Sequence, residues 1–236
     1  GVPSQATEMS FSVHETDVDF EYNGHTLTSL FAQRRNLLRP AFYRLLGEIL
    51  RFNRLAVADL ARPGQDTSSD ALLMPLGDYL DGHGFSDDFQ RHYLLPMGGA
   101  IWSASLADIR AFPTRFFLRF FHHHGLLSVN DRPQWYTVEG GSRGYIDAMV
   151  APYADAIRLA TPVRGIRREH DGVVLRTDAG EERFDQLVLA CHADQALGLL
   201  DDPSHAEREV LSALPYADNE VVLHTDTRLL PRRRRA

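Results

Sequence analysis

Three short stretches of the sequence carry residue types that could do chemistry, and the first is a glycine-rich turn. Residues 140–144 read Gly-Gly-Ser-Arg-Gly and lie between an expected strand and an expected helix. Backbone N–H groups at such a turn can hold an anion or the edge of a cofactor. The spacing differs from the G-x-G-x-x-G of dinucleotide-binding turns, which the sequence nowhere contains. Two interpretations stay open for Gly140 and Gly141: a plain strand-to-helix turn, and close approach to a cofactor.

Consecutive histidines at 122–124 form the second stretch. Neighbouring side chains on a helix point about 100° apart, so three consecutive imidazoles do not converge on one ion. We therefore expect no metal site. The histidines indicate a polar helix end, and the alternative is a histidine that lines a substrate pocket, for which His124 at the helix exit is the candidate.

The third stretch is Cys191 with His192, which follows an apolar run at 187–190 that reads as a strand covered on both faces. Ligands gather at the carboxyl ends of such strands. Neighbouring residues on a strand point to opposite faces, so we expect backbone contact with a cofactor at Ala190 and Cys191 rather than a Cys–His nucleophile pair. Cys191 is the only cysteine, which rules out an intrachain disulfide and indicates a cytoplasmic protein.

Composition narrows the chemistry further. All 25 basic residues are arginine, which excludes Schiff-base and lysine general-base mechanisms from this chain. The formal net charge of -7 gives no reason to expect nucleic acid as a partner. No apolar run approaches the roughly 20 residues that span a bilayer. The arginines at 232–235 indicate a solvated loop, with an anionic or peripheral membrane surface as the alternative. The chain starts without Met and stops just after an extended segment, so we expect a fragment; its oligomeric state is not predictable.

The elements that position these groups fall into a helix-rich first part and a strand-rich second part, which predicts a mixed α/β chain. In the first part we expect strands at 9–14 and 20–22 and a brief helix at 27–33. An amphipathic helix then starts at Pro40 and buries residues 42, 45, 46, 49, 50 and 55. After a loop at 63–70 and a helix at 76–82, Ser86 caps a further helix, which Pro96 and the glycines 98–99 interrupt. A helix opened by Pro113 aligns Phe116, Phe117, Phe120 and Phe121, which face either the core or an apolar substrate cavity.

The second part opens with a frame at residues 135–197. It predicts a strand, the glycine turn, a helix, strands at 157–159 and 161–166, a hairpin of 173–177 with 181–184, the strand at 187–190 and another helix. Beyond the frame, Ser204 caps a helix that ends near residue 213, and 220–225 reads as a last strand.

Several of these segments together resemble a known family. The runs at 135–141, 161–166 and 184–192 resemble the middle of the flavin-containing amine oxidase superfamily, which also holds protoporphyrinogen oxidases and carotenoid desaturases. The runs at 9–13, 30–37, 92–97 and 100–103 look still closer to bacterial predicted NAD/FAD-binding proteins often found beside cyclopropane-fatty-acid synthase-like genes. The resemblance covers nearly the whole chain and indicates a central fragment.

The resemblance implies part of a Rossmann-like FAD-binding domain into which a largely helical substrate domain is inserted. Residues 1–17 would form strands at the domain junction, 18–132 the substrate domain and 133–236 the partial FAD-binding domain. FAD is the implied cofactor, with most of its contacts outside this chain. The resemblance carries a backbone contact to the adenine end of FAD onto Val163, and a turn near the nucleotide onto Ala190 and Cys191.

Many members of the superfamily place a lysine beside flavin N5 on a strand that matches roughly 221–223, and this sequence has no lysine. We therefore expect hydride removal from an apolar, fatty-acyl type of substrate, and a role in lipid metabolism, rather than amine oxidation. Trp102, His124 and Trp135 are the candidates for the substrate pocket. The whole protein would be an FAD-dependent oxidoreductase, and this chain alone inactive. The alternative is a non-catalytic module that binds an apolar ligand or partner and lacks a working cofactor site.

Overall fold

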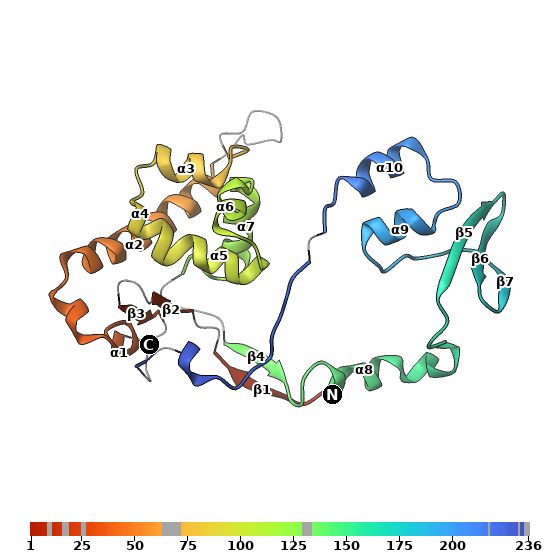
Figure 1. Ribbon diagram of the computed structural model, residues 1–236, viewed down its shortest axis with the longest axis horizontal. Helices are drawn as coiled ribbons and strands as arrows, with labels where there is room; N and C mark the ends of the chain where they lie inside the picture. Colours follow the sequence, from red (N-terminus) through yellow and green to blue (C-terminus); the bar gives the residue numbers. More distant parts are fainter. Residues whose placement is uncertain are drawn as a thin grey trace. The chain divides into compact units, whose positions relative to one another are not determined.

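The computed structural model describes residues 1–8, 11–15, 19–24, 27–62, 72–128, 134–216, 218–230 and 232–233. The chain forms two compact units (Figure 1). The first unit combines Gly1–Gly141 with Leu223–Ala236, and the second is Ser142–Val222. Both units mix helices and strands, as expected. The assignment of 18–132 and 133–236 to substrate and cofactor domains stays a prediction.

Two pairs of antiparallel strands belong to the first unit. Strand β1 (Ser4–Thr7) pairs with β4 (Trp135–Val138), so the two ends of residues 1–141 meet in one ladder. Strand β2 (Ser12–Glu15) pairs with β3 (Phe20–Asn23). The expected strands near 9–14 and 20–22 are therefore present within the described residues, while residues 9 and 10 lie outside them.

The rest of the first unit is helical and surrounds one apolar core. In chain order its helices are α1 (Leu27–Leu30), the 3₁₀ helix η1 (Arg34–Leu38), α2 (Pro40–Leu60), α3 (Leu76–Gly82), α4 (Asp87–Phe89), the π-helix η2 (Gln90–Leu94), α5 (Leu95–Trp102), α6 (Leu106–Ala111) and α7 (Thr114–His123). A final 3₁₀ turn, η4 (Thr227–Leu229), lies in the C-terminal part of this unit. The expected loop at 63–70 falls outside the described residues.

Helix α2 buries a somewhat different face from the one expected. Phe42 and Leu45 are buried as predicted, and the face continues through Phe52 and Ala56, which follow at helical spacing. Leu50 is 48% exposed. Its assignment to the buried face was wrong because it lies two positions from Phe52, which points it away from that face.

The helix that Ser86 caps continues where an interruption was expected. The Ser86 hydroxyl accepts from the Phe89 N–H at 3.2 Å, as predicted. Beyond Phe89 the chain forms one π-turn, in which the Leu95 N–H donates to the Gln90 carbonyl, and then passes into α5. Pro96 lies in the first turn of α5, where a proline is tolerated. The expected break at Pro96 was therefore wrong.

The second unit contains a three-stranded antiparallel sheet with helices before and after it in the chain. Its elements are α8 (Arg143–Val150), η3 (Ala151–Ala156), β5 (Val163–Glu169), β6 (Gly172–Thr177), β7 (Gly180–Phe184), α9 (Ala193–Leu199) and α10 (His205–Ser212). The predicted hairpin is confirmed, since β6 pairs with β7 and Thr177 lies opposite Gly180. An isolated parallel bridge also joins Ile166 to Leu200.

Three expected strands are not formed by the described residues. Residues 157–159, 187–190 and 220–225 carry no strand assignment. Most of their apolar side chains are exposed to solvent, with Val188 88% and Leu223 100% exposed, while Leu187 is partly buried. The apolar patterns are typical of buried strands, but a strand needs neighbours to take its N–H and C=O groups. The described residues supply no such neighbour, so the strand predictions were wrong for this chain.

Candidate functional site

The backbone geometry of the turn at 140–144 accounts for its two consecutive glycines. Gly140 and Gly141 have φ of 74° and 84°, the left-handed region that favours glycine. The Gly141 N–H donates to the Val138 carbonyl at 3.0 Å, which closes the turn at the end of β4. A Cβ at either glycine would meet nothing within 4 Å. The turn therefore needs both glycines for its shape, and it leaves open space beside them.

The residues expected near the nucleotide lie in the second unit. Val163 starts β5, at a register irregularity between Val163 and Gly165, and is half-buried. Ala190 and Cys191 are exposed, just before α9. The His192 ring stacks on Tyr216, with ring centroids 4.2 Å apart, and the Tyr216 hydroxyl accepts from the Ala193 N–H at 2.9 Å. Tyr216 thus fixes the start of α9, while the backbone at 190–191 remains accessible.

The phenylalanine stripe of α7 divides between core and surface. Phe117 and Phe121 are fully buried, whereas Phe116 is 52% exposed and Phe120 is partly buried. The Trp102 ring packs against Phe112, Phe116 and Phe120, with centroids 5.1, 6.0 and 4.7 Å away. Phe117 and Phe121 therefore face the core, as one interpretation expected, while a substrate cavity beside Phe116 and Phe120 stays a prediction.

His124 borders the same aromatic surface. Its ring stacks on Phe120 with a centroid separation of 3.9 Å, and its Nδ1 lies 2.8 Å from the Phe120 carbonyl oxygen. We call Trp102, Phe112, Phe116, Phe120 and His124 the aromatic surface. Two of the three predicted pocket residues, Trp102 and His124, therefore each contact the same ring, that of Phe120. The third, Trp135, lies on β4 opposite Thr7, and within the described ranges no ring contact joins it to the aromatic surface.

A cavity of about 240 Å³ lies between α2 and α3. Among its lining residues are Asp59, Arg62, Tyr79 and His83. The Tyr79 hydroxyl donates to Asp59 Oδ2 at 2.7 Å, and Arg62 Nη2 lies 3.0 Å from Asp59 Oδ1. Burial, reinforced by the Asp59 hydrogen bond, raises the pKa of Tyr79 well above its ordinary value. These contacts join the two helices, and the only sequence signal for them is one acidic residue near the end of an apolar helix face.

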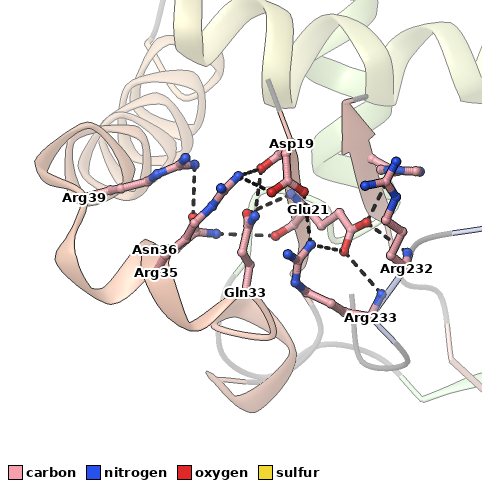
Figure 2. A network of polar contacts seen from close by, with 9 residues as sticks. Asp19, Glu21, Gln33, Arg35, Asn36, Arg39, Arg232 and Arg233 are labelled. Carbon is pink, nitrogen blue, oxygen red and sulfur yellow. Dashed lines mark hydrogen bonds and ion pairs between the residues drawn. The ribbon is translucent and has the colours of Figure 1, made fainter. Parts of the chain in front are cut away.

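A second buried polar network surrounds Glu21 (Figure 2). Its side chain is fully buried on β3 and accepts from the backbone N–H groups of Arg232 and Arg233 and from the Arg233 guanidinium. Burial acts to raise the pKa of Glu21, but the hydrogen bonds from Arg232 and Arg233 and the Arg233 charge outweigh it, so this pKa is lowered. The sequence carries no signal for this network, because Glu21 and its partners are over 200 positions apart.

The described ranges contain neither a cluster of metal ligands nor a helix that could span a membrane. No three His, Cys, Asp or Glu residues there gather closely enough to hold a metal ion. The rings of His122 and His123 at the end of α7 are 5.8 Å apart and steeply inclined. None of the described helices is long and apolar enough to cross a membrane.

Comparison with known proteins identifies the family. The family model described as flavin containing amine oxidoreductase matches residues 4–233. The chain belongs to this family. The expected resemblance to the superfamily is thereby confirmed, and FAD as the cofactor with it. The narrower likeness to proteins encoded beside cyclopropane-fatty-acid synthase-like genes stays a prediction. No curated protein sequence matches the chain.

Solved structures show the same fold. A triple mutant of putrescine oxidase, from a redesign of its cofactor binding, is 15% identical with a TM-score of 0.58. Wild-type putrescine oxidase bound to putrescine is 14% identical with a TM-score of 0.56. In both cases 89% of this chain and 47% of the other are covered. The chain thus has the FAD-binding amine oxidase fold and spans about half the length of these neighbours.

The cofactor candidates fit a flavin dinucleotide in part. In the second unit, the accessible backbone at Ala190 and Cys191 suits a ligand that is held by main-chain contacts. In the first unit, the turn at Gly140 and Gly141 separately offers open space for close approach. Val163, half-buried at the start of β5, also offers main-chain groups. Residues 188–191 are exposed, so the described part of the second unit does not enclose the backbone at 190–191.

Proposed function

We propose that this chain is the central part of an FAD-dependent oxidoreductase that removes hydride from an apolar, fatty-acyl type of substrate. The observation that carries the substrate class is the aromatic surface, where Trp102 and Phe120 are only partly buried and Phe116 is half-exposed. Apolar ligands are bound by surfaces of this kind, with a few polar groups for orientation. His124, stacked on Phe120, is the polar group at this place.

In such an enzyme the cofactor carries the redox chemistry, so the proposal requires no general base among the described residues. A bound flavin supplies the redox chemistry by accepting hydride. The residues of this chain bind and orient: main-chain groups at Val163, Ala190 and Cys191 would contact the dinucleotide, and the aromatic surface would hold the substrate and exclude water. Gly140 and Gly141 are proposed as a close-approach turn. Trp135 is kept as a further pocket candidate.

Two observations support an incomplete cofactor domain in this chain. The extended runs at 187–190 and 220–225 have the apolar composition of sheet strands, yet they lie exposed and unpaired in the described structure. In addition, about half of each putrescine oxidase structure has no counterpart here. The chain alone is therefore proposed to bind FAD weakly and to be inactive. The whole protein is proposed to work in the cytoplasm, in contact with apolar metabolites.

Putrescine is the ligand of one structural neighbour, and amine oxidation is the competing activity. The absence of lysine favours the apolar substrate, because a lysine close to the flavin is common in amine oxidation by this superfamily. The two substrate classes also differ in the polar partners they need, since the two charges of a diammonium ion require carboxylates when they are buried.

The deciding experiment uses the whole protein, with the flanking sequence that its structural neighbours contain. We expect it to purify yellow, and its visible flavin absorbance to bleach on anaerobic mixing with a fatty-acyl substrate but not with putrescine. Bleaching by putrescine alone would overturn the substrate class. A protein that stays colourless after addition of FAD would overturn the enzyme assignment and favour the non-catalytic, apolar-ligand module.

A further inference from the structure

Glu21 is buried among partners that come from the far end of the chain. Its Oε1 accepts from the Arg232 N–H at 2.9 Å, and its Oε2 accepts from the Arg233 guanidinium at 2.6 Å and from the Arg233 N–H at 3.3 Å (Figure 2). His14, opposite Glu21 on β2, places Nε2 3.3 Å from Oε1. A buried carboxylate is costly unless it is paired and hydrogen-bonded. The burial of Glu21 therefore depends on residues 232–233.

The backbone that presents Glu21 is held separately. The Gln33 side chain accepts from the Glu21 N–H at 3.2 Å and donates to the Asp19 carbonyl at 2.7 Å. The Asn36 amide donates to the Glu21 carbonyl at 3.4 Å. Arg35 pairs with the Asp19 carboxylate at 2.7 Å. All these groups lie within the first 40 residues, so β3 can offer its carboxylate whether or not the C-terminal segment is bound.

The C-terminal segment is otherwise weakly attached. We call residues 223–230 with 232–233, which belong to the first unit, the strap. Nearly all its described side chains are exposed, and among the described residues the hydrogen bonds and ion pairs of 223–230 are local, such as that between Arg228 and Asp226. The recorded polar contacts between the described strap and the rest of the first unit are those of Arg232 and Arg233 with Asp19 and Glu21.

We propose that Glu21 is the receptor of an ionic latch: it closes the strap onto β3, and the strap opens as a local unit while the helical core stays folded. When the strap moves away, water can hydrate the Glu21 carboxylate, so opening leaves no unpaired charge buried. When the latch is closed, residues 232–233 anchor the segment that follows the second unit in the chain. The segment that precedes the second unit is anchored by the pairing of β4 with β1.

The latch is independent of the proposed substrate and can be tested on this 236-residue chain. Glu21→Gln removes the negative charge of the carboxylate and leaves a neutral amide opposite the Arg233 guanidinium. We expect hydrogen exchange in peptides that cover 226–233, and tryptic cleavage after Arg228 and Arg232, to accelerate at least about tenfold, the factor expected when a hydrogen bond to a charged group is lost. Exchange in α2 and α7 should change less than about twofold, because opening is local.

Two further variants complete the test. Arg233→Gln removes the guanidinium that pairs with Glu21, and it leaves every buried residue of β3 unchanged. It should accelerate hydrogen exchange in the same peptides. Asp226→Asn breaks the exposed ion pair within the strap and should leave exchange unchanged. Uniform acceleration across the strap, α2 and α7 in both latch variants would mean that Glu21 is only a global stability element, and unchanged strap exchange would mean that other contacts hold the strap. Either result would overturn the proposal.

Discussion

The Tyr22 hydroxyl donates a hydrogen bond to the carbonyl oxygen of His92 at 2.8 Å, and so joins β3 to the π-turn that precedes α5. Pro96 has no N–H to give to the carbonyl four residues before it, which is that of His92. Tyr22 supplies a donor there. Burial, with a smaller contribution from Tyr93, raises the pKa of Tyr22 well above its ordinary value, so the hydroxyl keeps its proton.

Replacing Tyr22 with Phe should therefore destabilise the first unit. The change leaves a partly buried carbonyl without this donor, and we expect the free energy of unfolding to fall by about 1–2 kcal/mol. Urea unfolding followed by tryptophan fluorescence measures it. Tyr43→Phe is the matched control, because the Tyr43 hydroxyl also donates to a carbonyl, that of Leu37 at 3.0 Å, but at an exposed site. A loss as small as the control's would show that another donor serves His92.

Gly98 marks the closest approach of α5 to its neighbours. A Cβ at this position would lie 2.9 Å from Ile109 Cγ2 and 3.1 Å from Phe117 Cε2, both on fully buried side chains. We expect Gly98→Ala to cost about 1–3 kcal/mol through overpacking. Gly47→Ala in α2 is the control with the opposite sign, since a Cβ there meets nothing within 4 Å. It should stabilise the chain by about 0.5–1 kcal/mol, measured by the same unfolding experiment.

The sequence predicts the elements that local rules govern. The Ser86 and Ser204 caps, the β6–β7 hairpin and the turn at Gly140 and Gly141 each depend on residues within a few positions. These were all located correctly. The break at Pro96 was wrong because a π-turn and the first-turn position of the proline let the helix continue, and neither is visible in a residue pattern.

The wrong strands have a different cause. Apolar runs such as 187–190 predict where a strand can form, but pairing depends on neighbours that another part of a sheet must supply. The polar networks were missed for a related reason. Glu21 meets Arg233, and Asp59 meets Tyr79, across long sequence separations that no spacing rule covers. For the candidate site, the sequence predicts Trp102, His124 and Trp135 in one pocket, and the structure joins only the first two to a common neighbour, Phe120, among the described residues. The division of the α7 stripe appears only in the packed structure.

The two faces of α7 should respond differently to truncation. Phe117→Ala empties a fully buried position and should cost about 3–5 kcal/mol of unfolding free energy. Phe116→Ala removes a half-exposed ring and should cost less than about 1 kcal/mol. In the whole protein, the proposed function predicts that Phe116→Ala also raises the KM for an apolar substrate about tenfold, since a lost aromatic contact is worth about 1–2 kcal/mol. An unchanged KM would remove Phe116 from the substrate surface.

Glu207 should make the end of the second unit sensitive to acid. Its carboxylate accepts from Arg168 Nη1 at 2.7 Å and from the Ser204 N–H at 2.7 Å, and these contacts, the arginine bond first, lower its pKa from about 4.5 to about 2. A carboxyl whose pKa is lower in the folded state contributes its full stabilisation above the unfolded pKa and loses it as the pH falls through the folded pKa. Helix α10 should therefore loosen as the pH falls from about 4.5 to about 2. Hydrogen exchange of the α10 amides measures this loosening.

Glu207→Gln is the control, because glutamine also suits the capping box but cannot titrate, so α10 of this variant should lack the pH dependence. Equal acid loosening in both proteins would place the responsible carboxyl elsewhere.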